Sequence, residues 1–565
     1  MSDDIEKIPG SSPTPKPVDE AEENFKPKTL KFWAILVSLF LAMFLVALDR
    51  TIIGTAIPQI TQEFNSLGDI GWYSSAYQLT TATSQLLFGR IYKFYETKRT
   101  FLWSILVFEI GSLICGAAPN SRALIIGRAV AGFGGAGLFT GVMVVMLPLI
   151  PLRKRPAFQG AFGSVFGIAS VMGPLIGGGL TDGVTWRWCF YINLPIGGLA
   201  VLCLIFLHVP KNKQDPPTIW QQITRLDPLG TIFFVPSIAC LLFALQWGGS
   251  TYAWNNWRII TLMVFFGALL LAFVAVQVTM PDTATVPARI ITRRSIWAGA
   301  VFMFCLSGSM MMIIYFTPLW FQVVQGVSAM DSGVYTLPFM LSLVAASIIS
   351  GGITTKIGYY VPAMILSPSL LSVGQGLMST FRVRETPAHW IGYQFVAGFG
   401  LGCGMQSAGL AAQAVLAKPD IPTGIAIMFF SQQLGGAVFT SVGQNLLSSR
   451  MTSQIGRIIP GIENAASGIV DQGAGELVAK VPPEFRSRVR EAYNDTITTI
   501  LMCGMGVALC GVVAALFMEW KNIKKKGSDD ASDDASPASK SPHRSHPSES
   551  RSGPILESTS HKDLS

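Results

Sequence analysis

Charged residues are scarce in this chain: they make up 13% of its 565 residues, while 50% of the sequence is hydrophobic. An ordinary soluble domain carries about 25% charged residues. A chain of this length with so little charge cannot cover one globular core with polar surface, so lipid must be its main solvent. The net charge of +8 comes from basic residues spread over short loops. We therefore expect no nucleic-acid partner.

Several chemical signatures are also missing. The eight cysteines form no CxxC pair and lie in apolar stretches, so we interpret them as small apolar residues rather than disulfides or metal ligands. No GxxxxGK[ST] loop occurs, which excludes an ATP-driven pump. The five histidines form no constellation with a nucleophile or with metal ligands. We expect neither an enzyme nor a cofactor.

Long apolar runs are plentiful instead. Windows of about 20 apolar residues predict fourteen membrane spans and an all-α polytopic membrane protein. The predicted spans are 33–57, 70–89, 100–118, 122–148, 157–180, 188–208, 229–247, 259–280, 296–324, 333–355, 360–380, 389–416, 423–446 and 496–518. The polar flanks, 1–32 and 519–565, are predicted to be a disordered N-terminus and a disordered tail. No signal-peptide pattern precedes the first span, which we expect to direct insertion itself.

The distribution of Lys and Arg predicts the orientation of the spans. Most of these residues in short loops fall in every second connection, beginning with 89–100, so both termini are expected in the cytoplasm. The longer connection 447–495 is an exception that we place outside, with short amphipathic helices over the outer mouth. Its sequon at Asn494 lies close to the last span, and we expect no glycan there.

An internal repeat indicates a duplicated architecture. The tetrapeptide AGFG occurs at 131–134 and again at 397–400, each time in a long Gly-rich span. We predict two six-helix bundles, 33–208 and 296–518, joined by a linker at 209–295 that holds two additional spans. Parallel repeats of this kind build secondary transporters, which favours alternating access over a channel or a receptor.

Ionisable residues inside the apolar runs are few, and each is a candidate functional group. They are Asp49, Arg50, Glu109 and Arg128. A carboxyl group in an apolar surrounding favours its neutral form, so Asp49 could bind a proton on one side of the membrane and release it on the other. A structural ion pair between Asp49 and Arg128 is the alternative. Glu109 is a second proton candidate or a packing residue, and we interpret Arg50 as snorkelling to the surface.

The fifth predicted span is rich in glycine and lacks charge. Its sequence GAFGSVFGIASVMGPLIGGG, residues 160–179, has the helix-breaking pair Gly173-Pro174 at its centre. Neighbouring helices can re-satisfy the backbone groups that such residues free, and glycines allow close helix approach. Gly160, Gly177 and Gly178 complete the set of small residues. We expect this span to bend, to pack tightly and to serve a conformational change.

Met, aromatic and uncharged polar residues in other spans are candidates for binding an apolar substrate. Methionines and aromatics can repack around varied ligands, although most of them must pack against helices or lipid. Glutamine amides could hydrogen-bond a ligand or tie helices together. The candidates are Gln78, Tyr315, Phe316, Trp320, Gln322 and Gln432.

Taken together, these motifs resemble the major facilitator superfamily, and within it the fourteen-span drug:proton antiporters. LDRTIIGTAIPQI at 48–60 resembles the first-span motif of that group, and GRAVAGFGGAG at 127–137 resembles the fourth-span motif around an arginine. The glycines at 160–178 match the fifth-span antiporter motif, with Ala169 in place of one glycine. WRWCFYINLPIGG at 186–198 and YFTPLWFQVVQG at 315–326 match as well. The resemblance covers roughly residues 33–518.

One loop departs from the superfamily pattern. In GRIYKFYETKR at 89–99, Lys93 and Glu96 stand where an Asp and a Gly are usual, so the charge-relay role of that loop is in doubt. This altered form resembles the fungal branch that exports mycotoxins and other lipophilic metabolites. The resemblance implies a monomeric plasma-membrane or vacuolar protein that exchanges protons for a small lipophilic metabolite, toxin or drug. Uptake or exchange of a siderophore or an amino acid on the same fold is the alternative.

Overall fold

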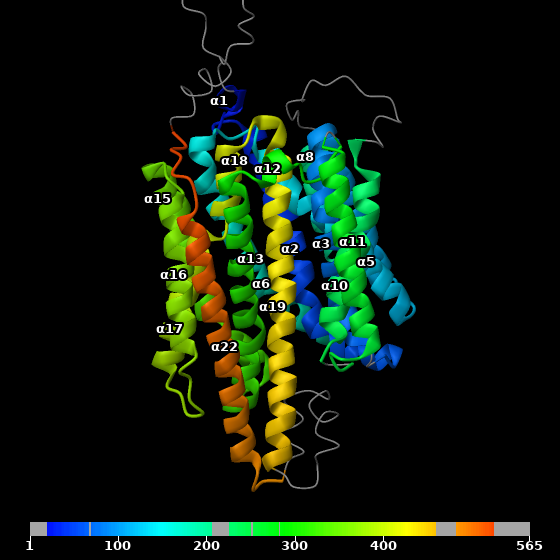
Figure 1. Ribbon diagram of the computed structural model, residues 1–565, viewed down its shortest axis with the longest axis vertical. Helices are drawn as coiled ribbons and strands as arrows, with labels where there is room; N and C mark the ends of the chain where they lie inside the picture. The colour runs from blue at the N-terminus through cyan, green and yellow to red at the C-terminus, as the bar shows by residue number, and fades with distance from the viewer. Residues whose placement is uncertain are drawn as a thin grey trace, which may run out of the picture. The chain divides into compact units, whose positions relative to one another are not determined.

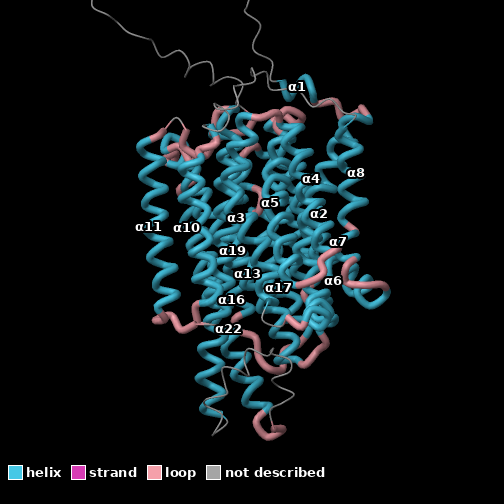
Figure 2. The backbone as a smooth tube through the Cα atoms, turned by 90° about the vertical axis from the view of Figure 1, so that its right-hand side faces the viewer, coloured by secondary structure: helices cyan, strands magenta, loops and turns pink. Residues whose placement is uncertain are grey.

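The computed structural model describes residues 20–66, 69–205, 225–249, 252–281, 283–458 and 482–524. Helices make up nearly all of the regular structure of these residues (Figure 2). The amino-terminal part contains α1 (Glu20–Asn24), α2 (Leu30–Phe64), α3 (Ile70–Phe94), α4 (Thr97–Gly116), α5 (Ser121–Met146), η2 (Leu152–Lys154), α6 (Arg155–Gly183), α7 (Trp188–Tyr191) and α8 (Asn193–Ile205). Two further long helices follow, α10 (Pro228–Trp247) and α11 (Trp257–Thr279), and then the short α12 (Ala288–Ile291).

The carboxy-terminal part repeats this pattern of long helices. It contains α13 (Arg294–Trp320), the π-helical turn η3 (Phe321–Gln325), α14 (Ala329–Tyr335), α15 (Leu337–Ile357), α16 (Val361–Met378), α17 (Pro387–Gly404), α18 (Ser407–Val415), η4 (Lys418–Asp420), α19 (Ile421–Ile458) and α22 (Arg486–Leu516). The long helices run side by side, and both ends of the described chain lie at the same end of the bundle (Figure 1).

Local sequence signals explain where several helices begin and end. Asn120 accepts a hydrogen bond from the Ala123 amide at the start of α5, as N-cap residues do. Pro156, Pro228 and Pro387 lie in the first turns of their helices, where a missing N–H costs nothing. Gly358 ends α15 with φ of 85°, a left-handed conformation that glycine adopts without strain.

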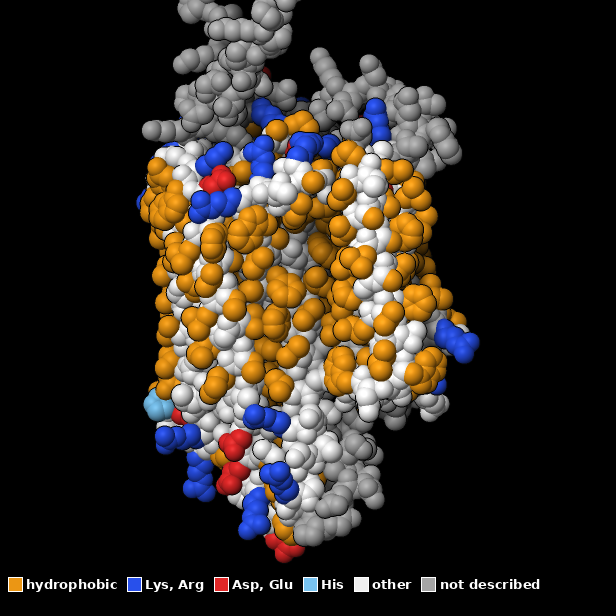
Figure 3. Space-filling model, in the orientation of Figure 1, with side chains coloured by type: hydrophobic (Ala, Val, Ile, Leu, Met, Phe, Trp, Pro, Cys, Tyr) orange, Lys and Arg blue, Asp and Glu red, His pale blue; other side chains and the backbone are white. Residues whose placement is uncertain are grey.

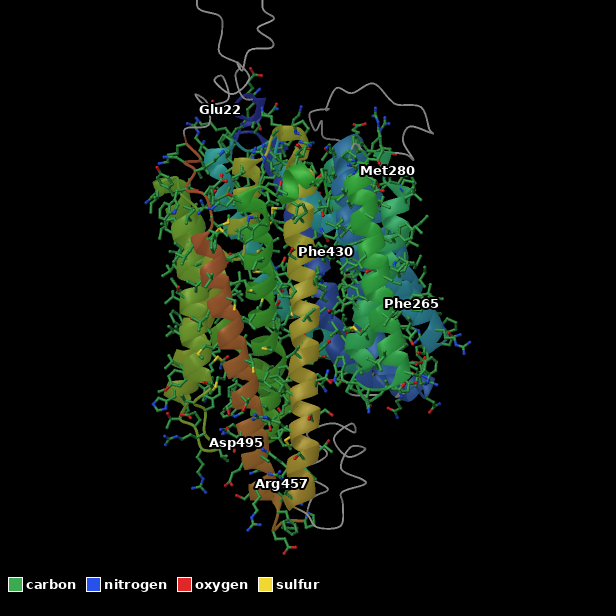
Figure 4. The ribbon with its side chains drawn as sticks, in the orientation of Figure 1. Glu22, Phe265, Met280, Phe430, Arg457 and Asp495 are labelled. Atoms are coloured by element: carbon green, nitrogen blue, oxygen red, sulfur yellow. The ribbon has the colours of Figure 1, made fainter. Side chains whose placement is uncertain are left out.

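The outer surface of the bundle is apolar between two polar ends. Figure 3 shows hydrophobic side chains across the middle of the helices, with Lys and Arg side chains above and below. Leu271 on α11 and Val513 on α22 are among the exposed large hydrophobic residues, and Phe265 projects from the flank of α11 (Figure 4). Among the described residues, 13 helices are long and apolar enough to cross a membrane. The more polar α3 lies outside that set, but it packs between α5 and α19 and occupies the predicted second span.

The two copies of AGFG pack in the same way, which supports the predicted duplication. A side chain at Gly111 of α4 would overlap the backbone of Ala131, and one at Gly374 of α16 would overlap Ala397. The second residue of each copy is equally tight: a Cβ at Gly132 would overlap Tyr77 of α3, and one at Gly398 would overlap Phe339 of α15. Each copy therefore lets three helices approach at backbone distance.

Helices α10 and α11 are held to the end of α3 by buried polar contacts. Asp227 accepts hydrogen bonds from the Gly230 amide at 2.8 Å and from Gln277 Nε2 at 2.6 Å, which joins the start of α10 to α11. Arg90 of α3 donates to the carbonyl oxygens of Arg225 at 2.6 Å and Ala284 at 2.7 Å. The basic residue that opens the 89–99 loop thus fastens the two additional helices.

Some predicted boundaries were wrong. The predicted external loop 447–495 is largely helical at both ends, because α19 continues to Ile458 and α22 begins at Arg486. Residues 459–481 and 525–565 lie outside the described part, and so does most of 1–32, from which α1 and the start of α2 emerge. Helices α19 and α22 extend beyond the apolar stretch because they pack against each other there. Hydropathy cannot report such a contact.

Candidate functional site

A buried ion pair lies at the contact between α2 and α5. Arg128 Nη1 donates to Asp49 Oδ2 at 2.6 Å, and the two side chains are 1% and 0% exposed. Arg128 Nε also donates to the Tyr73 carbonyl oxygen at 2.9 Å. On the other carboxylate oxygen, Asn193 Nδ2 donates to Asp49 Oδ1 at 3.3 Å. The geometry therefore matches the alternative stated from the sequence, an ion pair between Asp49 and Arg128. Both carboxylate oxygens of Asp49 have hydrogen-bond partners.

Glu109 of α4 lies near this pair but does not join it. Its side chain packs against Gly197 of α8, where a Cβ would overlap the carboxylate. Both carboxylate oxygens are buried, and neither has a hydrogen-bond partner in the described part of the chain. Ser112, one turn further along α4, accepts a hydrogen bond from Asn193 at 3.2 Å. Asn193 thus links the surroundings of Glu109 to the ion pair.

The glycines of α6 divide into two contacts. A side chain at Gly173 would overlap Thr51 of α2, and one at Gly177 would overlap Thr55 of the same helix. Further along, a Cβ at Gly160 would overlap the carbonyl oxygen of Ser347 on α15, in the carboxy-terminal part of the chain. Gly178 has open space around its Cα, and the neighbouring Pro174 is exposed. The predicted tight packing therefore rests on Gly160, Gly173 and Gly177.

The six predicted substrate residues have different surroundings. Trp320 is buried and its Nε1 donates to Asn494 Oδ1 at 2.8 Å, while Gln322 donates to Ser332 Oγ at 2.9 Å. The remaining four differ in exposure: Phe316 is buried, Tyr315 is 57% exposed, Gln78 is exposed on α3, and Gln432 is buried on α19. Phe316 packs in the core, and Trp320 and Gln322 form hydrogen bonds to neighbouring helices.

Asn494 is a structural residue of α22. Its Oδ1 accepts from Trp320 and its Nδ2 donates to the Phe381 carbonyl oxygen at 3.0 Å. The amide nitrogen that would carry a glycan is therefore buried and hydrogen-bonded.

The sequence interpretation that Arg50 snorkels to the surface was wrong. Its Nη1 donates to Gln433 Oε1 of α19 at 3.3 Å, so the guanidinium bridges helices from the two parts of the chain. The rings of Tyr77 on α3 and Phe139 on α5 lie 5.5 and 5.8 Å from its Cζ atom. Sequence reasoning missed this contact because Gln433 is 383 positions away.

A second charged cluster joins the two parts of the chain at the end that carries α1. Lys93 Nζ at the end of α3 lies 2.9 Å from Asp420 Oδ1, and Arg289 of α12 lies 2.5 Å from the other carboxylate oxygen. Burial raises the pKa of Asp420, but the hydrogen bonds from Arg289 and Lys93 outweigh it and hold the pKa below its ordinary value. Glu96, the other unusual residue of this loop, pairs locally with Arg99 at 2.9 Å.

Comparison with known proteins identifies the fold and the family. The sequence profile of the Major Facilitator Superfamily matches residues 39–440. The MFS-type efflux pump MFS1 of Arthroderma benhamiae is 50% identical, over 88% of this chain and 93% of the pump. The rubrofusarin-specific efflux pump aurT of Gibberella zeae is 47% identical, over 89% and 92%. Efflux pump aflT of Aspergillus parasiticus is 45% identical, over 90% and 99%.

A solved structure shows the same helix arrangement at low identity. The human organic anion transporter MFSD10 superimposes with a TM-score of 0.53 at 13% identity, covering 84% of this chain and 99% of that one. At this identity the likeness concerns the fold alone. The relatives are transporters rather than enzymes, and the bundle has the helices of a multi-pass membrane protein. The chain therefore belongs to the Major Facilitator Superfamily and is a membrane transport protein related to fungal MFS-type efflux pumps.

Proposed function

We propose that this protein exports a small lipophilic metabolite, toxin or drug in exchange for protons, by alternating access. The observation that carries the proposal is the buried Asp49–Arg128 pair, which no packing requirement explains. An ion pair taken out of water seldom stabilises a protein more than well-packed apolar residues of similar volume would. Its presence between two membrane helices fits a group that gains and loses a proton.

The contacts between the two parts of the chain support alternating access. Gly160 against Ser347 and Lys93 against Asp420 hold the parts together toward the end that carries α1. The residues in these contacts are small or charged rather than large and apolar. These particular contacts can separate without exposing an extensive apolar surface, which fits a rocking motion between repeats.

The relatives and the loops support the proposed direction of transport and the proposed orientation. Relatives at 45 to 50% identity are named efflux pumps, which favours export over uptake of a siderophore or an amino acid. The basic loops lie at the end of the bundle where the described chain begins and ends, which favours cytoplasmic termini. We place the monomeric protein in the plasma membrane, with the vacuolar membrane as the alternative.

A transport assay with an imposed pH gradient tests this proposal. The full chain is reconstituted in proteoliposomes, and movement of the neutral lipophilic dye N-phenyl-1-naphthylamine is followed with and without the gradient. Each proton supplies about 1.4 kcal/mol per pH unit, so the dye should accumulate against its gradient. Asp49→Asn should abolish this accumulation while leaving dye exchange at equilibrium intact, because exchange requires no proton to leave.

Asp182→Asn, which removes an exposed carboxylate from α6, is the matched control and should transport normally. Full gradient-driven accumulation by Asp49→Asn would move the proton site elsewhere, with Glu109 as the next candidate. No accumulation by the wild-type protein under any gradient would reject proton exchange itself.

A further inference from the structure

Arg50 places an uncompensated positive charge where the two parts of the chain meet. Its guanidinium contacts Tyr77 of α3, Phe139 of α5 and Gln433 of α19. The side chain is half-buried, so part of it remains accessible. A charge inside a membrane bundle normally faces a partner or a binding cavity, because desolvation is costly.

The neighbouring carboxylate does not neutralise this charge. Asp49 uses one oxygen for Arg128 and the other for Asn193. Among the described residues, no Asp or Glu oxygen lies within 4.0 Å of Arg50, and its buried Nε atom has no hydrogen-bond partner. Arg50 therefore has no direct carboxylate partner in the described part of the chain. A ligand that would compensate the charge of Arg50 is an oxyanion whose oxygens accept hydrogen bonds from Nε and Nη.

The surroundings of Arg50 also define the shape of a ligand. Phe139 of α5 and Phe429 of α19 meet edge to face across the two parts of the chain, with ring centroids 4.6 Å apart. Phe429 lies one helical turn before Gln433 on α19, so the ring and the amide share one face of that helix. Aromatic rings beside a planar guanidinium favour a flat aromatic ligand that carries its negative charge at the edge.

We propose that Arg50, Tyr77, Phe139, Phe429 and Gln433 form a binding site for a planar aromatic anion, whose carboxylate or phenolate oxygen pairs with Arg50. The inference deepens the proposed function, because it names the chemical class of the exported compound. It goes beyond the six residues predicted from the sequence, none of which belongs to this group. Gln433 supplies a second polar contact from the opposite part of the chain, so the ligand touches both moving parts.

A matched pair of fluorescent probes tests the site by equilibrium binding, without any gradient. The probes are 1-pyrenecarboxylate and its neutral amide, 1-pyrenecarboxamide, which have nearly the same shape. The full-length protein is placed in phosphatidylcholine nanodiscs, so that no anionic lipid competes. A charge-assisted hydrogen bond contributes enough for the wild type to bind the carboxylate about tenfold or more tightly than the amide. Arg50→Gln should remove this preference and leave amide binding unchanged.

Two further variants separate charge from folding. Arg50→Lys keeps the charge but loses the planar fork, and should retain part of the preference. Arg258→Gln removes an arginine that lies 4.8 Å from the ring of Tyr252 at the start of α11, and it should keep the full preference. Equal binding of both probes by the wild type would overturn the inference. So would an Arg50→Gln protein that still prefers the carboxylate, or a wild type that binds neither probe.

The binding result and the transport result can fail separately. If the wild type prefers the carboxylate but moves no compound in response to a pH gradient, the proposed proton exchange fails and the anion site stands. If gradient-driven transport of the neutral dye succeeds but the preference is absent, the anion site fails and the exporter stands.

Discussion

At the residue scale, the ion pair in α2 and α5 should behave as a unit in stability measurements. Arg128→Gln leaves Asp49 buried without its cation, and breaking such a pair costs about 3–5 kcal/mol. The double variant Asp49→Asn, Arg128→Gln leaves neither charge behind, so it should melt at a higher temperature than Arg128→Gln alone. Thermal unfolding of the purified protein in detergent checks this. A double variant less stable than the single one would show that the pair itself stabilises the fold.

The contacts of Asp420 should respond to pH only in acidic solution. Because the pKa of Asp420 is lowered in the folded protein, its bonds to Lys93 and Arg289 are fully present above its ordinary value of 3.8 and are lost only as pH falls through the lower one. The cluster is partly exposed, so its contribution to the stability of the folded protein is about 1 kcal/mol. Asp420→Asn should change the transport rate by roughly fivefold, with a pH profile parallel to that of the wild type.

The control for that experiment is Asp331→Asn, an exposed carboxylate near the start of α14 that lies outside the cluster. Transport rates from about pH 5 to pH 8 in proteoliposomes supply the profile. A profile of Asp420→Asn that flattens in this range would mean that Asp420, rather than a residue in the bundle, titrates during transport.

The sequence identified some of these residues and could not identify others. Asp49 and Arg128 stand out because a charge in an apolar run is conspicuous, and their pairing was one of two stated interpretations. Arg50 was misassigned because the rotation of α2 relative to α19 depends on packing between distant segments. Lys93 was recognised as unusual, but its partner Asp420 is 327 positions away and lies in no motif.

At the element scale, the two contacts of α6 predict different outcomes for similar substitutions. Gly160→Ala would push a methyl group into the Ser347 carbonyl of α15, across the seam between the two parts of the chain. We expect this variant to reach the membrane and to lose most gradient-driven transport, because the seam can no longer close. Gly178→Ala, on the same helix with open space around it, is the control and should transport normally. Normal transport by Gly160→Ala would show that the seam is not required to close.

Gly173 tests the other contact of the same helix. A side chain there would overlap Thr51 of α2, which lies in the same part of the chain. Gly173→Leu should therefore lower the melting temperature as well as transport, whereas Gly160→Ala should affect transport chiefly. Pro174→Ala is expected to reduce transport because it removes the proline from the interior of α6, while its exposed position predicts little change in stability. Thermal unfolding and dye transport, measured on the same preparations, distinguish the two classes.

Helix positions were well predicted from hydropathy, while helix ends were not. Thirteen of the predicted spans coincide with helices that are apolar enough to cross a membrane, and α3 occupies the remaining one. Hydropathy detects lipid-facing and buried apolar surface, so it fails where a helix leaves the bilayer. Both α19 and α22 continue there and pack against each other, and 447–495 was predicted as a loop for this reason.

At the scale of the whole molecule, the described chain begins and ends on one side of the bundle (Figure 1). We expect epitope tags placed before α1 and after α22 to be accessible from the same face of sealed vesicles, and from the cytoplasmic face if the loop charges set the orientation. Antibody access before and after permeabilisation checks this. Tags accessible from opposite faces would contradict an even number of spans.

The long helix α19 has a further mechanical consequence. Its 38 residues extend about 57 Å, against about 30 Å for the hydrocarbon core of a bilayer. The Asp420 contact with Lys93 lies directly before its first residue, and Gln433 lies in its first half. Toward its far end, Arg450 donates to Thr499 of α22 at 2.7 Å. Arg457 and Asp495 mark this projecting pair of helix ends (Figure 4).

A helix of this length works as a lever. A tilt of about 10° around its midpoint would move each end by about 5 Å, so opening at one face would be visible as displacement at the other. An antibody fragment that binds the projecting ends of α19 and α22 would then prevent this tilt. It would inhibit transport from the far side of the membrane without entering the substrate pathway.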